Sequence, residues 1–259
     1  MSTVESRQFL KADLWREWAL FETDQRKQLP PPPVEKPAPP GASLIDLVPP
    51  DDFSIGQMSL IDAIRRRRSR RSFTGEALTL EELSFLLWAT QGVRRDKAGA
   101  PVHRGAAVLR TVPSGGARHP FETYVMIRNI EGLARGLYRY LPLEHKLCFL
   151  QPYDALVGKA EGLWAQQSFL EQAAVIFIWT DIPYRTEWRY SVLSAKIIAQ
   201  DSGHMCQNLY LACEAIGAGT CAIGAYDQQC ADALVGVDGE EEFTVYMAPV
   251  GKYPPGLSE

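Results

Sequence analysis

Hydrophobic side chains recur along this chain with two different periods, and each period predicts a different kind of element. Apolar positions at helical spacing predict helices over residues 6–25, 59–67, 80–91 and 191–216. Alternating or continuous apolar runs predict strands over residues 123–127, 136–141, 146–150, 173–180 and 243–249. Strands and helices do not alternate regularly in this order. The pattern therefore favours an α+β fold, with a mixed or antiparallel sheet flanked by helices.

Three local signals support these elements. Thr79 is followed by Glu82, which forms a capping box at the start of the helix over residues 80–91. Gly217 is suited to end the helix over 191–216, because glycine adopts the left-handed C-terminal conformation without steric cost. The segment 173–180 reads AAVIFIWT, and such a continuous apolar run predicts a strand that is buried on both faces.

Prolines divide the chain into two parts. Nine of the 18 prolines lie between Pro30 and Pro50, and such a run favours an extended polyproline conformation over helix or central strand. We therefore expect residues 1–57 to form an N-terminal helix and proline-rich arm, and residues 58–259 to form one domain. The helix over 6–25 has an apolar face that needs cover, so we expect residues 1–50 to pack across a second copy of the chain.

Composition and charge exclude several classes of protein. The chain is 46% hydrophobic and 22% charged, and 27 basic against 31 acidic residues leave a net charge of −4. This balance disfavours nucleic acid and anionic membranes as partners. An odd number of cysteines, five, without a CxxC motif predicts reduced thiols and a cytoplasmic protein. No secretory leader or membrane span is predicted, and the four histidines lack the spacing of a metal site.

The segment from Arg65 to Arg71 contains six arginines and one serine. Arginine forms forked, charge-assisted hydrogen bonds with phosphate oxygens, so this cluster predicts a site for a small polyanion. A solvated basic helix end and a nucleic-acid contact are the alternatives.

Two glycine-rich segments could approach a ligand closely. The segment Pro113–Pro120 reads PSGGARHP, and its glycines would let a planar ligand meet backbone N–H groups, although an ordinary turn has the same composition. The segment Gly217–Ala222 fits the GxGxxA dinucleotide pattern by letter. That pattern requires a strand before it and a helix after it, whereas here a helix precedes it. We therefore reject a Rossmann site.

The segment Tyr184–Tyr190 reads YRTEWRY and follows the predicted buried strand. A tyrosine phenol beside a cation could transfer a proton, and an aromatic rim is an equal alternative. No GxSxG, P-loop or HExxH motif occurs in the chain.

Taken in order, four segments resemble the nitroreductase-like FMN flavoproteins, and within them the SagB-type dehydrogenase branch. They are RRSRRSF (67–73), TVPSGGARHPFETYV (111–125), GLYRY (136–140) and DSGHMCQNLYLACEAIGAGTCAIGAYD (201–227). The resemblance covers about residues 60–252. It implies an FMN-dependent oxidoreductase, built as an intertwined homodimer with both flavins at the interface. Hydride would pass between the flavin and a small organic or peptide-azoline substrate, with NAD(P)H as a candidate reductant.

The same resemblance implies roles for particular residues. Those implied to bind the cofactor are Arg67, Ser69, Arg71, Pro113, Ser114, Gly115, Ile223, Gly224, Ala225 and Lys252. The first three and Lys252 would hold the phosphate end, the next three would reach the flavin of the other subunit, and the rest would lie beside the isoalloxazine ring.

Two positions depart from the pattern of the branch. Azoline oxidases of the branch use a Lys-Tyr pair for proton abstraction, and the nearest match here is Arg189-Tyr190. Arginine stays protonated near neutral pH, which leaves Tyr190 as the candidate catalytic residue. In addition, Ala225-Tyr226 stands where the branch usually has a small residue followed by phenylalanine.

Two other functions remain open at this point. One is a generic NAD(P)H-dependent nitro- or quinone reductase on the same fold. The other is a non-redox protein that binds flavin or nucleic acid, for which only the arginine run argues.

Overall fold

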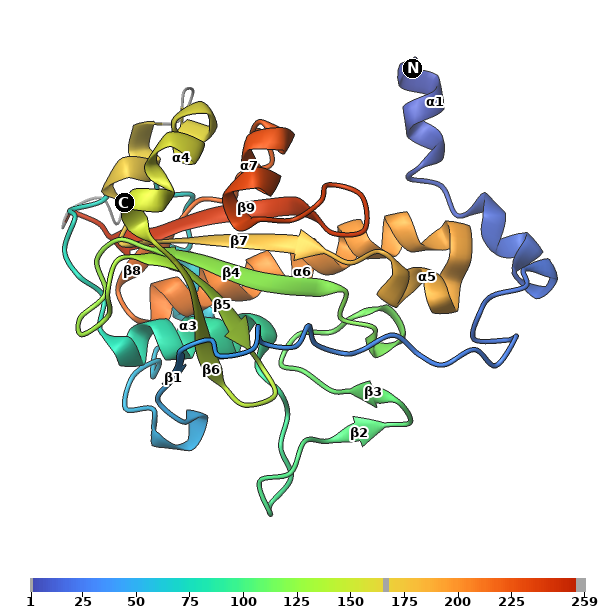
Figure 1. Ribbon diagram of the computed structural model, residues 1–259, viewed down its shortest axis with the longest axis horizontal. Coiled ribbons are helices and arrows are strands. Elements are labelled where there is room, and N and C mark those ends of the chain that lie inside the picture. Colours follow the sequence, from blue (N-terminus) through green and yellow to red (C-terminus); the bar gives the residue numbers. More distant parts are fainter. Residues whose placement is uncertain (1, 165–167, 255–259) are drawn as a thin grey trace.

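The computed structural model describes residues 2–164 and 168–254 of the 259-residue chain. Its centre is a sheet with the strand order β1-β6-β5-β4-β7-β9-β8, in which all neighbouring strands are antiparallel (Figure 1). The strands are β1 (Leu44–Asp46), β4 (Phe121–Ile127), β5 (Gly136–Leu141), β6 (Lys146–Pro152), β7 (Val175–Asp181), β8 (Ala218–Thr220) and β9 (Phe243–Lys252). A separate hairpin of β2 (His103–Arg104) and β3 (Ala107–Val108) projects from the sheet. The predicted α+β class is confirmed.

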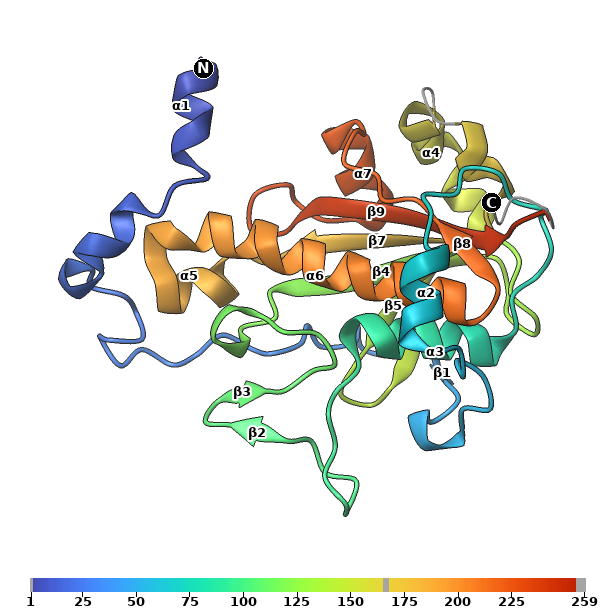
Figure 2. The same cartoon turned by 180° about the vertical axis from the view of Figure 1, so that it is seen from behind.

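Helices cover both faces of the sheet. Side chains of α3 (Leu80–Gln91) and α6 (Ser194–Ala215) share one apolar cluster with one face. Those of α4 (Val157–Trp164) and α7 (Gln228–Val235) share a second cluster with the other face. Seen from behind, α2 (Leu60–Arg66) lies beside α6, and α5 (Tyr184–Tyr190) lies at the N-terminal end of α6 (Figure 2).

Strand β7 shows why the continuous apolar run AAVIFIWT was informative. Phe177 and Trp179 point into the cluster shared with α3 and α6, whereas Ile176 and Ile178 point into the cluster shared with α4 and α7. Successive side chains of a strand face opposite sides, so a central strand with two covered faces must be apolar at every position. The prediction of a strand buried on both faces is confirmed.

The N-terminal helix predicted over residues 6–25 is wrong. The chain there forms a short α1 (Thr3–Gln8) and a 3₁₀ helix, η1 (Asp13–Leu20). Leu10 is 69% exposed and Leu20 is 77% exposed, so much of the apolar face is uncovered within this chain. An isolated helix of this length is marginal in water without packing, which explains why periodicity alone misled.

The proline-rich arm packs on the chain's own core, while the expectation that residues 1–50 also pack across a second copy stays a prediction. The carbonyl of Pro33 accepts from Arg185 Nε at 2.9 Å, and that of Val34 accepts from Arg110 at 2.8 Å. Arg139 donates to the carbonyl of Pro37 at 2.7 Å. Polyproline segments make no internal hydrogen bonds, so their carbonyls are available to buried arginines.

The remaining elements agree with the sequence in part. The capping box is present, because Glu82 N donates to Thr79 Oγ1 at 3.1 Å and Thr79 N donates to Glu82 at 2.9 Å. The helix predicted over 191–216 is α6, and Gly217 follows it with φ +67°. All five cysteines lie in the described residues and form no disulfide. Within the described ranges, every helix is too short or too polar to cross a membrane.

Candidate active site

The arginine run crosses the C-terminal end of α6. Helix α2 ends at Arg66, and the chain then turns so that Ser69 pairs with Thr220 of β8 in an isolated parallel bridge. The Ser69 hydroxyl lies 3.0 Å from the hydroxyl of Tyr210, and the Arg67 guanidinium lies 5.5 Å from the centre of the same ring. Tyr210 therefore organises this corner, although the sequence analysis did not single it out.

The arginines of the run face in opposite directions. Arg70 is buried, where it pairs with Glu214 at 3.4 Å and lies 3.7 Å from the centre of the Tyr253 ring. Arg71 is exposed and Arg67 is half-buried. A Cβ at residue 219 would stand 2.5 Å from Arg70 Cδ, so only glycine lets this side chain pass. Arg70 thus stabilises the fold through its buried contacts, while Arg67 and Arg71 remain at the surface.

The predicted segment 223–225 and Lys252 lie near the same corner. The Tyr210 hydroxyl accepts from Ala222 N at 2.8 Å, Ile223 is buried against β9, and Gly224 is exposed. Lys252 Nζ donates to Glu82 and to the carbonyl of Ile216, the latter at 2.9 Å. The ammonium of Lys252 is therefore held between α3 and the end of α6, rather than projecting beside the arginines.

The loop that contains Pro113 and Ser114 is fixed by one carboxylate of α6. Asp201 accepts from Ser114 Oγ at 2.6 Å and from Gly115 N at 3.0 Å, and Ser114 Oγ accepts from His119 N at 2.9 Å. Burial raises the pKa of Asp201, while these hydrogen bonds lower it. The Ser114 hydroxyl is thus used to shape the loop, and the exposed Pro113 is left at its surface.

Tyr190 lies against the same loop. Gly116 has φ +60°, and a Cβ there would stand 2.6 Å from the Tyr190 hydroxyl and 2.8 Å from Arg189 Nε. Trp15 and Trp18 of η1 contact the Tyr190 ring with centroid distances of 6.1 and 5.9 Å. The sequence analysis predicted Tyr190 and the loop 113–115 as separate candidates, and the fold brings them into contact.

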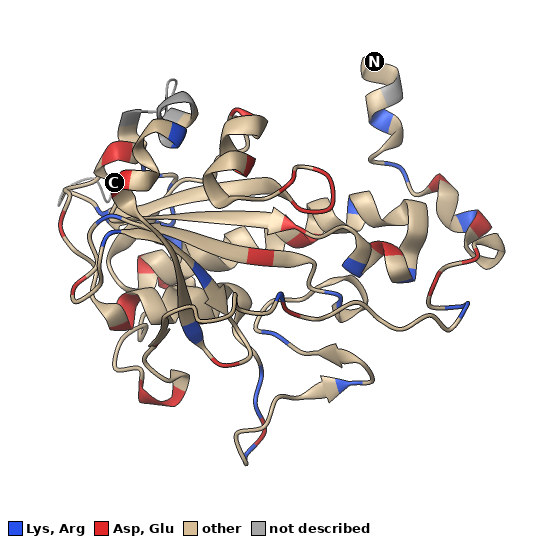
Figure 3. Cartoon of the chain, viewed as in Figure 1, with Lys and Arg blue, Asp and Glu red and all other residues tan. Residues whose placement is uncertain are grey.

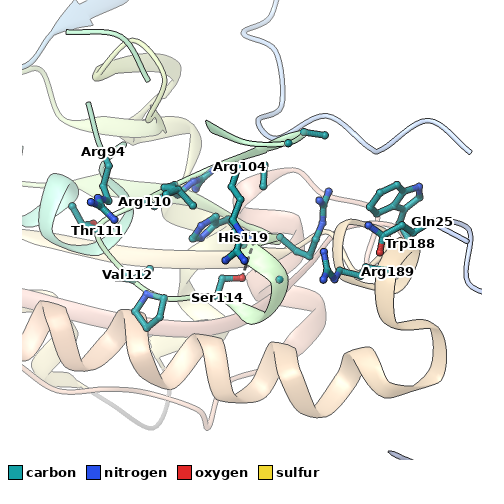
Figure 4. A pocket seen from close by; sticks show the side chains of 18 residues that line it. Gln25, Arg94, Arg104, Arg110, Thr111, Val112, Ser114, His119, Trp188 and Arg189 are labelled. Carbon is teal, nitrogen blue, oxygen red and sulfur yellow. Dashed lines mark hydrogen bonds between the residues drawn. The ribbon is translucent and has the colours of Figure 1, made fainter. Parts of the chain in front are cut away.

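A cavity of about 760 Å³ opens between this loop, the β2–β3 hairpin and α5 (Figure 4). Arg94, Arg104 and Arg110 approach it from the hairpin side, and Arg189 approaches it from α5. Burial, followed by the charges of two neighbouring arginines, lowers the pKa of His119 in its wall to about 2. The cavity therefore presents a neutral imidazole among guanidinium groups, and the sequence analysis did not identify it.

One chain does not bring all of the predicted cofactor residues together. Ser69 contacts Tyr210 at one end of α6, whereas Ser114 contacts Asp201 nearer the other end. Nine residues of helix separate the two contact positions, which is roughly 14 Å at ~1.5 Å per residue. The arginine corner and the loop 113–115 are therefore separate surfaces of the monomer.

Comparison with known proteins decides the family. A model of the nitroreductase family matches residues 64–252, which include both surfaces. The chain belongs to the nitroreductase family. A protein of Methanocaldococcus jannaschii named as a nitroreductase is 32% identical over 200 residues, which cover 76% of this chain and 93% of that protein. A nitroreductase-family assignment makes the chain an oxidoreductase.

A second curated relative matches a smaller part of the chain. The trifolitoxin-processing protein TfxB of Rhizobium leguminosarum bv. trifolii is 32% identical over 126 residues, which are 44% of this chain and 31% of TfxB.

Two solved structures share the fold over most of the chain. A structure from Ralstonia eutropha JMP134, described as a nitroreductase, has TM-score 0.66 and 27% identity, and covers 87% of this chain and 99% of that one. The Escherichia coli microcin synthetase McbBCD complex with truncated pro-MccB17 has TM-score 0.61 and 18% identity, and covers 98% of each chain. At that identity, the second likeness concerns the fold alone.

Proposed function

We propose that this nitroreductase-family protein is an FMN-dependent oxidoreductase of the SagB-type dehydrogenase branch. One observation carries the proposal. The half-buried Arg67 and the Ser69 hydroxyl both contact Tyr210, Arg71 is exposed two residues further on, and neither arginine has a carboxylate partner within residues 2–164 and 168–254. Guanidinium groups and a hydroxyl are the donors that a phosphate monoester requires.

The surroundings of this corner fit such a ligand. Gly224 is exposed, and a Cβ there would meet nothing within 4 Å, so a flat ring could approach the backbone of residues 223–225. Lys252 is held by Glu82, so the phosphate site is proposed on the two arginines and Ser69, and a role for Lys252 stays a prediction. When bound, FMN would supply hydride transfer through its N5.

We further propose that the flavin lies between two copies of the chain. In that arrangement Arg67, Ser69 and Arg71 of one copy and Pro113–Gly115 of the other would complete one site. Ser69 and Ser114 contact α6 nine positions apart, at Tyr210 and Asp201, and this separation supports the arrangement. Asp201 would keep the loop rigid by accepting from Ser114 and Gly115.

Tyr190 is the proposed proton-transfer residue. Its phenol lies at the loop that would meet the flavin, and the Arg189 guanidinium lies 5.5 Å from its ring centre. Arginine stays protonated, so Arg189 would stabilise negative charge rather than abstract a proton. The similarity to TfxB, a trifolitoxin-processing protein, supports a substrate of the kind that the dehydrogenase branch takes, which we propose is a peptide azoline.

A generic NAD(P)H-dependent nitro- or quinone reductase is the second candidate, favoured by the name of the M. jannaschii relative. Anaerobic addition of NADH or NADPH separates the two functions. Rapid bleaching of a bound flavin by either nucleotide favours the reductase. Bleaching by an azoline peptide, with release of the azole product, favours the dehydrogenase.

The cofactor itself is tested by mutation. Arg67→Ala and Arg71→Ala should each weaken FMN binding about 10- to 150-fold, because a charge-assisted hydrogen bond contributes about 1.5–3 kcal/mol. Arg65→Ala is the matched control, since Arg65 is exposed and lies near Asp62 instead. Fluorescence titration with FMN measures all three variants. A colourless protein that FMN cannot reconstitute, or equal losses in all three, would contradict the proposal.

A further inference from the structure

The cavity beside the loop 113–119 has walls of one charge. Five arginines line it, and none of its lining residues is an aspartate or glutamate. The arginines are Arg94, Arg104, Arg110, Arg118 and Arg189. Like charges repel in a partly enclosed space, so a fold that collects them there without acids is suited to an anionic ligand.

Some of these arginines already have structural partners, and others do not. Arg118 Nε donates to the Arg185 carbonyl at 2.9 Å, and Arg110 donates to Gln91 and Val34. Arg110 is nevertheless 6% exposed with an Nε that finds no acceptor among the described residues.

The two arginines from the hairpin side are the most available. Arg94 and Arg104 are exposed, and within the described ranges neither side chain forms a hydrogen bond or ion pair. Their guanidinium groups can therefore turn to a ligand without breaking a contact of the fold.

A second cavity on the other side of α5 has the opposite charge. Its volume is about 590 Å³, and its walls include Asp181, Glu187, Glu240 and Glu241 but no lysine or arginine. The acidic loop before β9 is visible in Figure 3. Helix α5 thus separates an acidic from a basic cavity, and only the basic one borders the loop 113–115 and Arg189.

We propose that the basic cavity binds an anionic group of the substrate, a carboxylate or a phosphate, and so selects anionic substrates for this oxidoreductase. The inference rests on the proposed function, because the reacting part of the substrate must reach the flavin beside Tyr190. Arg94 and Arg104 would bind the anion through charge-assisted hydrogen bonds, which strengthen where water is excluded. The distal anion would orient the reacting end toward the loop.

The test compares three nitroaromatic probes that differ in charge. The flavin-loaded protein is reduced anaerobically with one equivalent of dithionite and mixed with 4-nitrobenzoate, methyl 4-nitrobenzoate or 4-nitrophenyl phosphate. Reduction of the nitro group takes two electrons and two protons from the reduced flavin, and yields the nitroso compound, water and oxidised flavin. Flavin absorbance gives the rate, and calorimetry on the protein with oxidised flavin gives the affinity for each probe without turnover.

We expect 4-nitrobenzoate to bind and react at least about tenfold better than its neutral ester. Arg94→Gln and Arg104→Gln should each reduce this preference roughly tenfold, with little change for the ester. Lys97→Gln is the control, since it removes one exposed positive charge from the same hairpin region but does not line the cavity. If 4-nitrophenyl phosphate exceeds the neutral ester in affinity and rate by more than 4-nitrobenzoate does, the site is assigned to phosphate. The reverse order assigns it to carboxylate.

The failures of the two proposals are distinguishable. A protein that binds no FMN contradicts the proposed function, while calorimetry still tests the cavity. Equal rates for anionic and neutral probes in the flavin-loaded protein overturn the anion site and leave the oxidoreductase intact. The anion site would also be overturned if Arg104→Gln lost as much FMN affinity as Arg67→Ala, because the cavity would then bind the cofactor.

Discussion

Asp181 is a carboxyl group in a position where ionisation is costly. It is 1% exposed, and its Oδ1 has no hydrogen-bond partner among the described residues. Burial first, and the nearby Glu187 second, raise its pKa to about 8, while Arg185 opposes the shift. The folded protein therefore holds a proton on Asp181 at neutral pH that the unfolded chain releases near pH 4.

This difference makes stability depend on pH. Between the unfolded and folded pKa values, the folded state binds one more proton, so the free energy of unfolding falls as pH rises, by about 1.4 kcal/mol per pH unit. Asp181→Asn should remove this dependence, leaving the variant more stable than the wild type at pH 8.5 and similar to it at pH 4.5. Urea unfolding of both proteins at pH 4.5 and pH 8.5 measures the difference in their free energies of unfolding. Parallel pH dependences for the two proteins would show that Asp181 is already ionised when folded.

Gly116 joins the loop to the proposed catalytic tyrosine. Its φ of +60° disfavours any side chain, and a Cβ would overlap the Tyr190 hydroxyl and the Arg189 side chain. Gly116→Ala should therefore lower the rate of flavin oxidation by nitroaromatic probes, beyond a stability loss of about 1–2 kcal/mol. Gly99→Ala is the control, because Gly99 has φ +80° but nothing within 4 Å of its Cβ position. Equal activity in the two variants would mean that the packing of Tyr190 does not matter for the rate.

At the scale of elements, the proline-rich arm behaves as part of the core. Its carbonyls accept from Arg110, Arg139 and Arg185, all of which are buried. Leu29 and Gln25 add hydrogen bonds to Trp188, which holds the arm against α5. Removing the arm would take the acceptors of Arg139 and one acceptor each from Arg110 and Arg185.

Two truncations separate the arm from the segment before it. Deleting residues 1–20 should leave a folded protein, since most side chains of η1 and α1 are exposed. Deleting residues 1–40 should cost several kcal/mol, because each unsatisfied buried donor costs about 1–3 kcal/mol and more when charged. Thermal unfolding of both truncations measures the difference. Equal melting temperatures would contradict a structural role for residues 21–40.

The same elements show which features of the fold can be predicted from sequence. β7 and α3 were predictable because a two-sided apolar run and a capping box are local signals. α7 was missed although Asp227 caps its start and Gly236, with φ +78°, ends it, so a local signal existed there. β1 and the pairing of Ser69 with Thr220 could not be predicted, since short strands are defined by partners far away in sequence.

The candidate site could be predicted residue by residue, but its contacts could not. Motif resemblance named Ser69, Ser114 and Tyr190, but their partners Tyr210, Asp201 and Gly116 emerge only when α6 and α5 are folded against them. Arg104, Arg110 and Arg118 of the basic cavity come from one stretch of the chain, but Arg94 and Arg189 join them only when the hairpin and α5 fold against that stretch.

At the scale of the whole molecule, exposed apolar side chains suit association with a second copy. Leu60, Ile61 and Ile64 of α2 are 65%, 55% and 57% exposed, next to the proposed phosphate site. An apolar stripe of this kind is typical of a surface that another protein covers. A second copy that covers this stripe would lie beside Arg67, which directly follows the end of α2.

A shared site predicts that two defective variants restore each other. Arg67→Ala combined with Arg71→Ala removes the proposed phosphate donors, and Pro113→Trp places bulk on the exposed end of the loop without touching Asp201. Each variant alone should bind little FMN. In a heterodimer purified through two different tags, the intact arginines of one copy face the intact loop of the other, so one of two sites is whole. We expect about half the wild-type FMN per dimer. Light scattering confirms the dimer and absorbance gives the flavin content. If the heterodimer is as empty as its parents, each flavin site must lie within one chain.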